Sequence, residues 1–160
     1  MEKSSRIHKP DPHDPSLAKF RVFADLAPEE LSVLVDHSAR AEFSAGERII
    51  TSGEEGHCMY VVLGGSARVE AGGIEIATIS EGDFFGEVSL VDDGPRSADV
   101  VAVSDCRLLV ITRMTLGVLA GIQPSAAIHL LAAIGRSLVA KLRADNRRLR
   151  ELILLGRAAP

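Results

Sequence analysis

The chain has 160 residues, of which 46% are apolar and 25% charged, and its formal net charge is −4 at pH 7. This length suits one domain with a full hydrophobic core, and the negative charge gives no general attraction to nucleic acid. Cys58 and Cys106 stand alone, without the spacing of a disulfide or a metal site. The first residues lack the apolar run of a secretory signal, and we identify no window with the length of a membrane span. These features predict a cytoplasmic protein that does not associate with membranes.

The amino-terminal segment changes character near residue 17. Residues 1–16 are predicted to be a disordered tail because Lys9–Pro15 offers no apolar face to bury. From Leu17 the pattern becomes helical, and Pro28–Glu30 is typical of a helix start, where proline fits the first turn and acidic residues suit the positive end of the helix dipole. We therefore place the start of the folded domain at residue 17 and its end near residue 155.

The middle of the chain, about residues 41–111, has the pattern of a β-structure. Short runs of strand-forming residues alternate with turns centred on glycine, such as Gly64–Gly65 and Gly72–Gly73. The predicted strands are Ala41–Phe43, Arg48–Thr51, Met59–Leu63, Ala67–Val69, Ile74–Ile79, Asp99–Val103 and Leu108–Ile111. Many short strands at this spacing favour a β-sandwich or barrel.

The segment Phe85–Ala98 interrupts the strands and carries the chemistry. It combines Gly86, Glu87, a short apolar helical turn and Arg96 within fourteen residues. Free N–H groups at a helix start favour an anion, an arginine can grip the same anion with its planar fork, and a carboxylate accepts hydrogen bonds from a sugar hydroxyl. These groups together suit a nucleotide whose phosphate is folded back onto its ribose.

Two helices are predicted after the strands. Thr112 can cap a short helix from Arg113 to about Leu119 that ends at Gly121, and Pro124 opens a long helix that runs to about Leu155. In the long helix Leu131, Leu138, Asp145 and Leu152 repeat every seven residues, with Gly135, Leu142 and Leu149 in the companion positions. Such a seam is typical of a coiled coil and predicts a homodimer; the alternative is a helix that packs on its own barrel.

Here the sequence resembles the cyclic-nucleotide-binding domain family, which includes the catabolite activator protein. The similarity spans roughly Phe23 to Leu155 and is carried by Phe43–Ile50, Met59–Gly65, Gly82–Glu87 and Pro95–Ala98. It implies an α+β fold: a β-roll, which is a jelly-roll-like antiparallel barrel, flanked by N-terminal helices and a long C-terminal helix.

The resemblance also implies roles for single residues. Gly86 would present its N–H to the ligand, Glu87 would accept a hydrogen bond from the ribose 2′-hydroxyl, and Arg96 would pair with the cyclic phosphate. Ser97 and Ala98 would bind the phosphate oxygens through their N–H groups. The expected ligand-binding set is completed by three neighbours, Phe85, Val88 and Ser89. Taken singly, Glu87 is also compatible with an ordinary acidic residue at a helix start and Arg96 with a surface arginine.

The base would lie under the long helix. Asp145 and Asn146 align with positions at which the catabolite activator touches adenine, so both are expected ligand contacts. For Asp145 two alternatives remain, a polar residue that sets coiled-coil register and simple solvent exposure. In the family that the sequence resembles, serine at the position of Ser97 is found in members that bind cAMP, whereas threonine often accompanies a preference for cGMP. The resemblance therefore favours cAMP over cGMP.

Other chemistries find no support in the sequence. The five histidines show no ligand spacing for a metal, and no nucleophile, base and orienting group can be assembled. Asp92 and Asp93 are interpreted as the solvated tip of a turn. We expect no catalytic residue, no metal and no cofactor other than the ligand itself.

The sequence thus predicts a cyclic-nucleotide sensor whose ligand repositions the C-terminal helices and signals to a protein effector. Two alternatives remain: a ligand-independent dimerisation or scaffold module of the same fold, and the sensor fragment of a transcription regulator of the catabolite-activator type. Too few residues follow Leu155 for a helix-turn-helix, so this chain alone is not expected to bind DNA.

Overall fold

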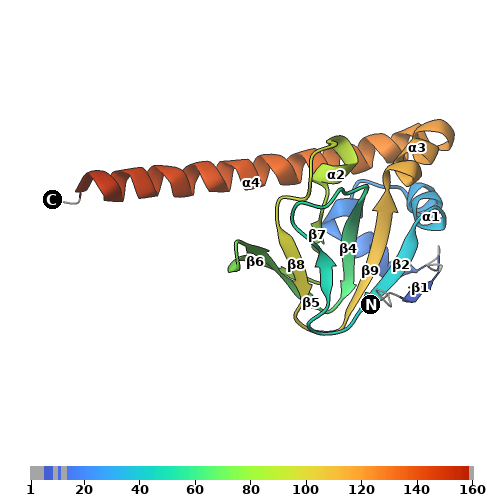
Figure 1. Ribbon diagram of the computed structural model, residues 1–160. Coiled ribbons are helices and arrows are strands. Elements are labelled where there is room, and N and C mark those ends of the chain that lie inside the picture. Colours follow the sequence, from blue (N-terminus) through green and yellow to red (C-terminus); the bar gives the residue numbers. More distant parts are fainter. Residues whose placement is uncertain (1–5, 9–10, 12–13, 159–160) are drawn as a thin grey trace.

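The structure is a computed structural model that describes residues 6–8, 11 and 14–158. Within these residues the strands form two antiparallel sheets that face each other as a β-roll, and the helices pack against the first sheet (Figure 1). The predicted α+β fold, a β-roll flanked by N-terminal helices and a long C-terminal helix, is confirmed.

The two sheets have different strand orders. The first contains, in spatial order, β1 (Arg6–His8), β2 (Ala39–Phe43), β9 (Cys106–Thr112), β4 (Cys58–Gly64) and β7 (Phe84–Phe85). The second contains β3 (Arg48–Ile50), β8 (Asp99–Ala102), β5 (Ser66–Ala71) and β6 (Ile74–Ser80). Several of the predicted turn glycines between consecutive strands have positive φ, as Gly65 does at 87°.

The helices are short except for the last. They are the 3₁₀ helices η1 (Pro15–Lys19) and η2 (Arg21–Phe23), followed by α1 (Pro28–Asp36), α2 (Val88–Val91), α3 (Arg113–Ile122) and α4 (Pro124–Ala158). Thr112 caps α3 as predicted, because its hydroxyl oxygen accepts a hydrogen bond of 3.0 Å from the N–H of Thr115. Gly121 does not end α3; the helix continues to Ile122, directly before Pro124 opens α4.

Two apolar cores follow from the alternation of side chains along β4 and β9. Met59 and Val61 of β4 point towards the helices and join a core with α1, α3 and the first turns of α4. Val62 points the other way and joins the core between the two sheets, together with Leu108 of β9. The first sheet therefore has helices on one face and the second sheet on the other, which fixes α4 against the roll.

The structure differs from the predicted tail at Arg6–His8, which form β1 and pair antiparallel with residues 40–42 of β2. A polar, proline-rich segment can still add a strand because pairing at a sheet edge uses backbone groups only. The rest of the predicted tail lies partly outside the described residues, at positions 1–5, 9–10 and 12–13.

The helix α4 corrects the prediction that no window reaches the length of a membrane span. Within the described residues, Pro124–Arg157 forms one helix that is long and apolar enough to cross a membrane by length and composition alone. Within this helix Ala126, Leu130 and Ile134 are fully buried against the roll, although only 28% of the apolar window is buried. Its apolar composition is therefore partly explained by internal packing.

Candidate functional site

The turn between β7 and α2 brings the predicted glycine and arginine into contact. Gly86 has a φ of 75°, a backbone conformation that residues with a side chain rarely adopt. A Cβ atom at this position would lie 2.7 Å from Nη1 of Arg96 and 3.3 Å from the carbonyl oxygen of Cys58. Glycine is thus required here both by conformation and by space.

Arg96 is half-buried and held by carbonyl groups. Its Nη1 donates to the carbonyl oxygen of Gly86 at 3.0 Å, and its Nη2 donates to that of Cys58 at 2.8 Å. Gly56 lets the side chain pass, since a Cβ there would lie 2.3 Å from Nε of Arg96. Both partners are neutral, so they orient the guanidinium without neutralising its charge, and that charge remains available to an anion.

Glu87 is buried, with 3% of its surface exposed. Its side chain makes no capping hydrogen bond to α2, which argues against the reading as an ordinary helix-start acid. Instead Oε1 forms an ion pair with Nζ of Lys141, which is on α4, 54 residues further along the chain. Lys141 was not predicted as a site residue, because nothing in the sequence indicates which side of α4 faces the turn.

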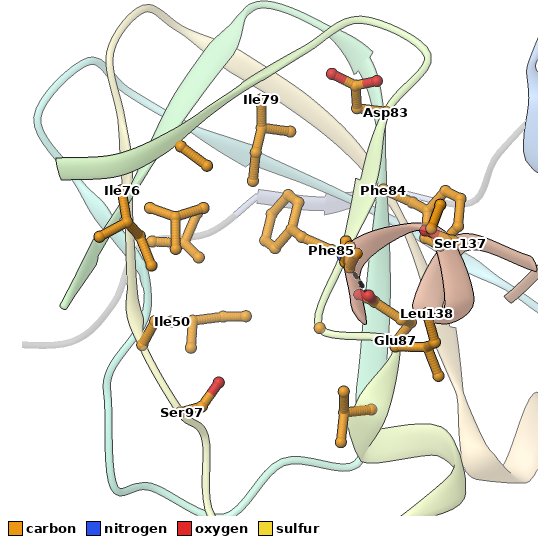
Figure 2. Close-up of a pocket in the computed structure, with 18 of the residues that line it drawn as sticks. Ile50, Ile76, Ile79, Asp83, Phe84, Phe85, Glu87, Ser97, Ser137 and Leu138 are labelled. Carbon is orange, nitrogen blue, oxygen red and sulfur yellow. Dashed lines mark hydrogen bonds and ion pairs between the residues drawn. The ribbon is translucent and has the colours of Figure 1, made fainter. Parts of the chain in front are cut away.

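A cavity of about 860 Å³ opens beside these residues, between the second sheet, the 85–98 segment and α4. This size lies within the range of small-molecule sites. The second sheet contributes an apolar wall of Ile50, Val69, Ile76, Ile79 and Val100. Figure 2 shows Ile50, Ile76 and Ile79 across the cavity from Glu87 and Leu138. This wall suits the flat apolar face of a nucleobase, whereas the polar side chains of Glu87 and Arg96 come from the 85–98 segment.

The structure brings most of the predicted ligand-binding residues to this cavity. Those that line it are Phe85, Gly86, Glu87, Val88, Ser89, Arg96, Ser97, Ala98 and Asp145. Phe85 is buried and its ring stacks on that of Tyr60, with centroids 5.2 Å apart. The carboxylate of Asp145 is exposed and lies 3.9 Å from Nη1 of Arg148.

Asn146 lies outside the cavity and is exposed, so the prediction that it shares the site with Asp145 differs from the structure. Consecutive residues of an α-helix point about 100° apart, and only residues three or four apart share a face. The cavity face of α4 instead carries Ser137, Lys141, Ala144 and Arg148 together with Asp145. Ser137 places a hydroxyl group on this face, more than two helical turns before Asp145.

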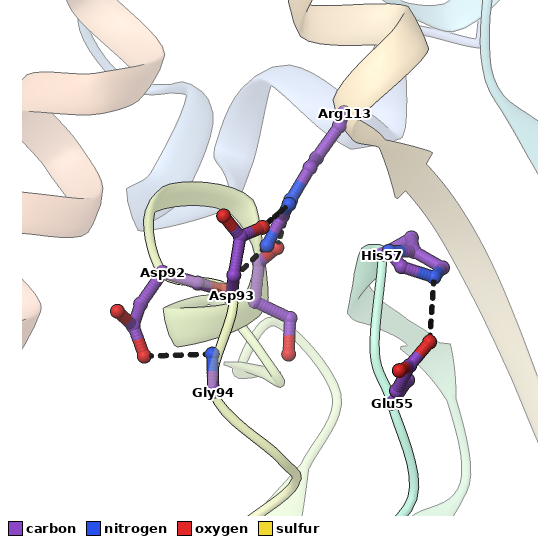
Figure 3. Close-up of polar contacts among 7 residues, drawn as sticks. Glu55, His57, Asp92, Asp93, Gly94 and Arg113 are labelled. Atoms are coloured by element: carbon purple, nitrogen blue, oxygen red, sulfur yellow. Dashed lines mark hydrogen bonds and ion pairs between the residues drawn. The ribbon is translucent and has the colours of Figure 1, made fainter.

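The 85–98 segment is also tied to the helices by Arg113, the first residue of α3. Its Nε donates to the carbonyl oxygen of Ser89 at 2.6 Å, its Nη2 donates to that of Asp92 at 2.5 Å, and its Nη1 pairs with the carboxylate of Asp93 (Figure 3). Asp93 is exposed, as expected for a turn tip, but it is not free. These contacts join the 85–98 segment to the start of α3.

A β-roll with a ligand-sized cavity, a glycine turn, an oriented arginine and a covering helix has the architecture of a small-molecule-binding domain. A family model described as cyclic nucleotide-binding domain matches residues 40–121, just over half of the chain. The chain therefore belongs to the cyclic nucleotide-binding domain family.

Relatives and solved structures agree with this assignment. The chain is 36% identical over 122 residues to the cyclic AMP receptor protein of Thermus thermophilus. This alignment covers 73% of this chain and 56% of the relative. It is 35% identical over 92 residues to a cAMP-dependent protein kinase regulatory subunit of Hypocrea atroviridis, covering 58% of this chain and 20% of the relative.

The crystal structure of the Thermus thermophilus catabolite activator protein has a TM-score of 0.70 and 35% identity, with 82% of this chain and 62% of that chain covered. The chain thus spans between a fifth and about three fifths of the length of these proteins.

Proposed function

We propose that this domain is a sensor of cyclic nucleotides and that its cavity holds the ligand between the 85–98 segment, the second sheet and α4. The observation that carries the proposal is the convergence of Gly86, Glu87 and Arg96 on one cavity with an apolar wall. In this arrangement Arg96 and the N–H groups of Ser97 and Ala98 bind the cyclic phosphate, and Glu87 accepts a hydrogen bond from the ribose 2′-hydroxyl. The base lies against the apolar wall and under α4.

The ligand is cAMP in preference to cGMP. Ser97 supports this choice, because serine at this position is found in family members that bind cAMP. Two relatives of this chain are also named for cAMP. On α4, Asp145 is the residue proposed to contact the edge of the base, since it lines the cavity. The domain acts as a regulatory module and not as an enzyme, and no metal is needed for this role.

Binding repositions the C-terminal helices. A ligand shifts a conformational equilibrium only through its different affinities for the two states, so the segment that contacts the ligand must be linked to the helices. Arg113 provides one such link, from Ser89, Asp92 and Asp93 to α3. The repositioned helices then signal to a protein effector. We further propose that the domain works in the cytoplasm as a homodimer through α4.

The decisive experiment is isothermal titration calorimetry with cAMP and with cGMP on the wild type and on Arg96→Ala. A hydrogen bond to a charged group contributes about 1.5–3 kcal/mol, so Arg96→Ala should weaken binding roughly ten- to a hundredfold. Arg143→Ala is the matched control, because Arg143 is on the exposed surface of α4 and does not line the cavity. If the wild type gives no heat with either nucleotide, the scaffold alternative replaces the sensor.

A further inference from the structure

An ion pair between Glu87 and Lys141 links the 85–98 segment to α4 at the edge of the cavity. Glu87 is a buried acid at the site, and Lys141 is the α4 residue whose ammonium group reaches it. The Lys141 side chain itself is half-exposed, at 54%. The acid is therefore fixed in the roll, while its cationic partner belongs to the helix that covers the cavity.

A buried carboxylate is strongly disfavoured in its charged form unless a positive group or hydrogen bonds compensate it. Lys141 supplies that compensation at Oε1. A carboxylate has two oxygens and about four acceptor sites, so Oε2 and the remaining lone pair of Oε1 stay available to a further donor. An ionised acceptor makes a hydrogen bond about twice as strong as a neutral one.

We propose that Lys141 is a positioning residue for nucleotide binding, which pairs with the Glu87 carboxylate and keeps it oriented towards the ribose 2′-hydroxyl of the ligand. This inference depends on the proposed function, since it concerns the same cavity. It also makes α4 part of the ribose subsite: the helix closes over the cavity through the same carboxylate that holds the sugar.

The geometry separates this role from a direct contact of Lys141 with the phosphate. Arg96 and Ser97 supply the proposed phosphate subsite, and Figure 2 shows Ser97 on the other side of the cavity from Glu87. Because the ammonium group of Lys141 is engaged by Glu87, it acts on the ligand through that acid. The contribution of Lys141 should therefore depend on the presence of the 2′-hydroxyl.

The test compares cAMP with its 2′-deoxy form by calorimetry on the full chain. Lys141→Met removes the charge and keeps the length of the side chain, Lys141→Arg keeps the charge, and Arg143→Met is the control on an exposed part of the same helix that does not line the cavity. We expect Lys141→Met to bind cAMP about tenfold more weakly, in line with the loss of a charge-assisted hydrogen bond. Lys141→Arg should recover most of the affinity, and Arg143→Met should match the wild type.

With the 2′-deoxy ligand, the wild type and Lys141→Met should bind equally. A Glu87→Gln background should likewise abolish the effect of Lys141→Met on cAMP binding. An equal loss with both ligands would assign Lys141 to the phosphate or to folding, and unchanged cAMP binding would leave it without a role; either result overturns the inference while the sensor function stands. If the wild type binds neither ligand, the proposed function itself fails. Thermal melting curves of each variant establish that it is folded.

Discussion

Gly86 illustrates how one residue sets the geometry of the whole site. Its positive φ turns the chain sharply between β7 and α2, and its missing side chain lets Arg96 lie against the turn. Arg96 returns the contact by donating to the Gly86 carbonyl oxygen at 3.0 Å. The conformation of the glycine and the position of the guanidinium are therefore coupled, and a substitution at Gly86 should disturb ligand binding as well as folding.

Gly86→Ala should lower both the free energy of unfolding and the affinity for the nucleotide. The left-handed backbone conformation costs a residue with a Cβ about 1–2 kcal/mol, and the new methyl group would also displace Arg96. Gly46→Ala is a matched control, because Gly46 has a φ of 87° but no atom within 4 Å of the added carbon. Urea denaturation and calorimetry on both variants should find a similar backbone cost, with weaker ligand binding only for Gly86→Ala. Equal binding by the two variants would contradict the coupling.

At the scale of the elements, the buried acid Glu30 of α1 links this helix to α4 through a polar contact with His129. The carboxylate of Glu30 accepts a hydrogen bond of 2.9 Å from the N–H of Ala27 and lies 3.0 Å from Nδ1 of His129 on α4. Hydrogen bonds from the Ser125 hydroxyl, from Ala27 and from His129 lower the pKa of Glu30 from its ordinary 4.5 to about 2. The first turns of α4 are thus held to α1 by an ionised group that stays ionised in moderately acidic solution.

The pH dependence of Glu30→Gln follows from this lowered pKa. A carboxyl group with a depressed pKa in the folded state stabilises the fold fully above its unfolded pKa, near 4.5, and loses that contribution as the pH falls through about 2. Urea denaturation should therefore find a large stability difference between the wild type and Glu30→Gln at pH 6 and a smaller one at pH 2.5. Glu29→Gln, at the exposed neighbouring position, should differ little from the wild type at both pH values. A Glu30→Gln difference that does not change with pH would refute this account.

Elements with a clear local pattern were predictable, and those that depend on tertiary contacts were not. Alternating residues and turn glycines located β2–β6, β8 and β9 to within three residues at each end. The two-residue β7 is too short for any alternation, and β1 lies in a polar stretch that lacks a strand pattern. The same division applies to the site: Gly86, Glu87 and Arg96 lie close in sequence and were predicted together, whereas Lys141 depends on how α4 is rotated about its axis.

At the scale of the whole molecule, α4 extends beyond the roll. Its first half packs on the core, but its second half projects away from both sheets (Figure 1). Of the predicted seam, Leu138 packs against the core, whereas Leu142, Leu149 and Leu152 are 57–66% exposed. The seam therefore has two parts with different roles, one internal and one that faces solvent in the single chain. Exposed leucines at a seven-residue spacing are typical of a helix that pairs with another helix.

The proposed homodimer can be tested by sedimentation equilibrium on the wild type, Leu142→Glu and Leu149→Glu. Burying a leucine side chain contributes about 1.5–3 kcal/mol, and a charged residue in the seam would also lose hydration, so each substitution should weaken association at least tenfold. Arg143→Glu places the same acid on the exposed surface of α4 outside the seven-residue seam and should leave the association constant nearly unchanged. Thermal melting curves should remain close to that of the wild type if the leucines act only between chains. A wild type that sediments as a monomer across the accessible concentrations would reject the dimer and leave the exposed leucines of α4 to another partner.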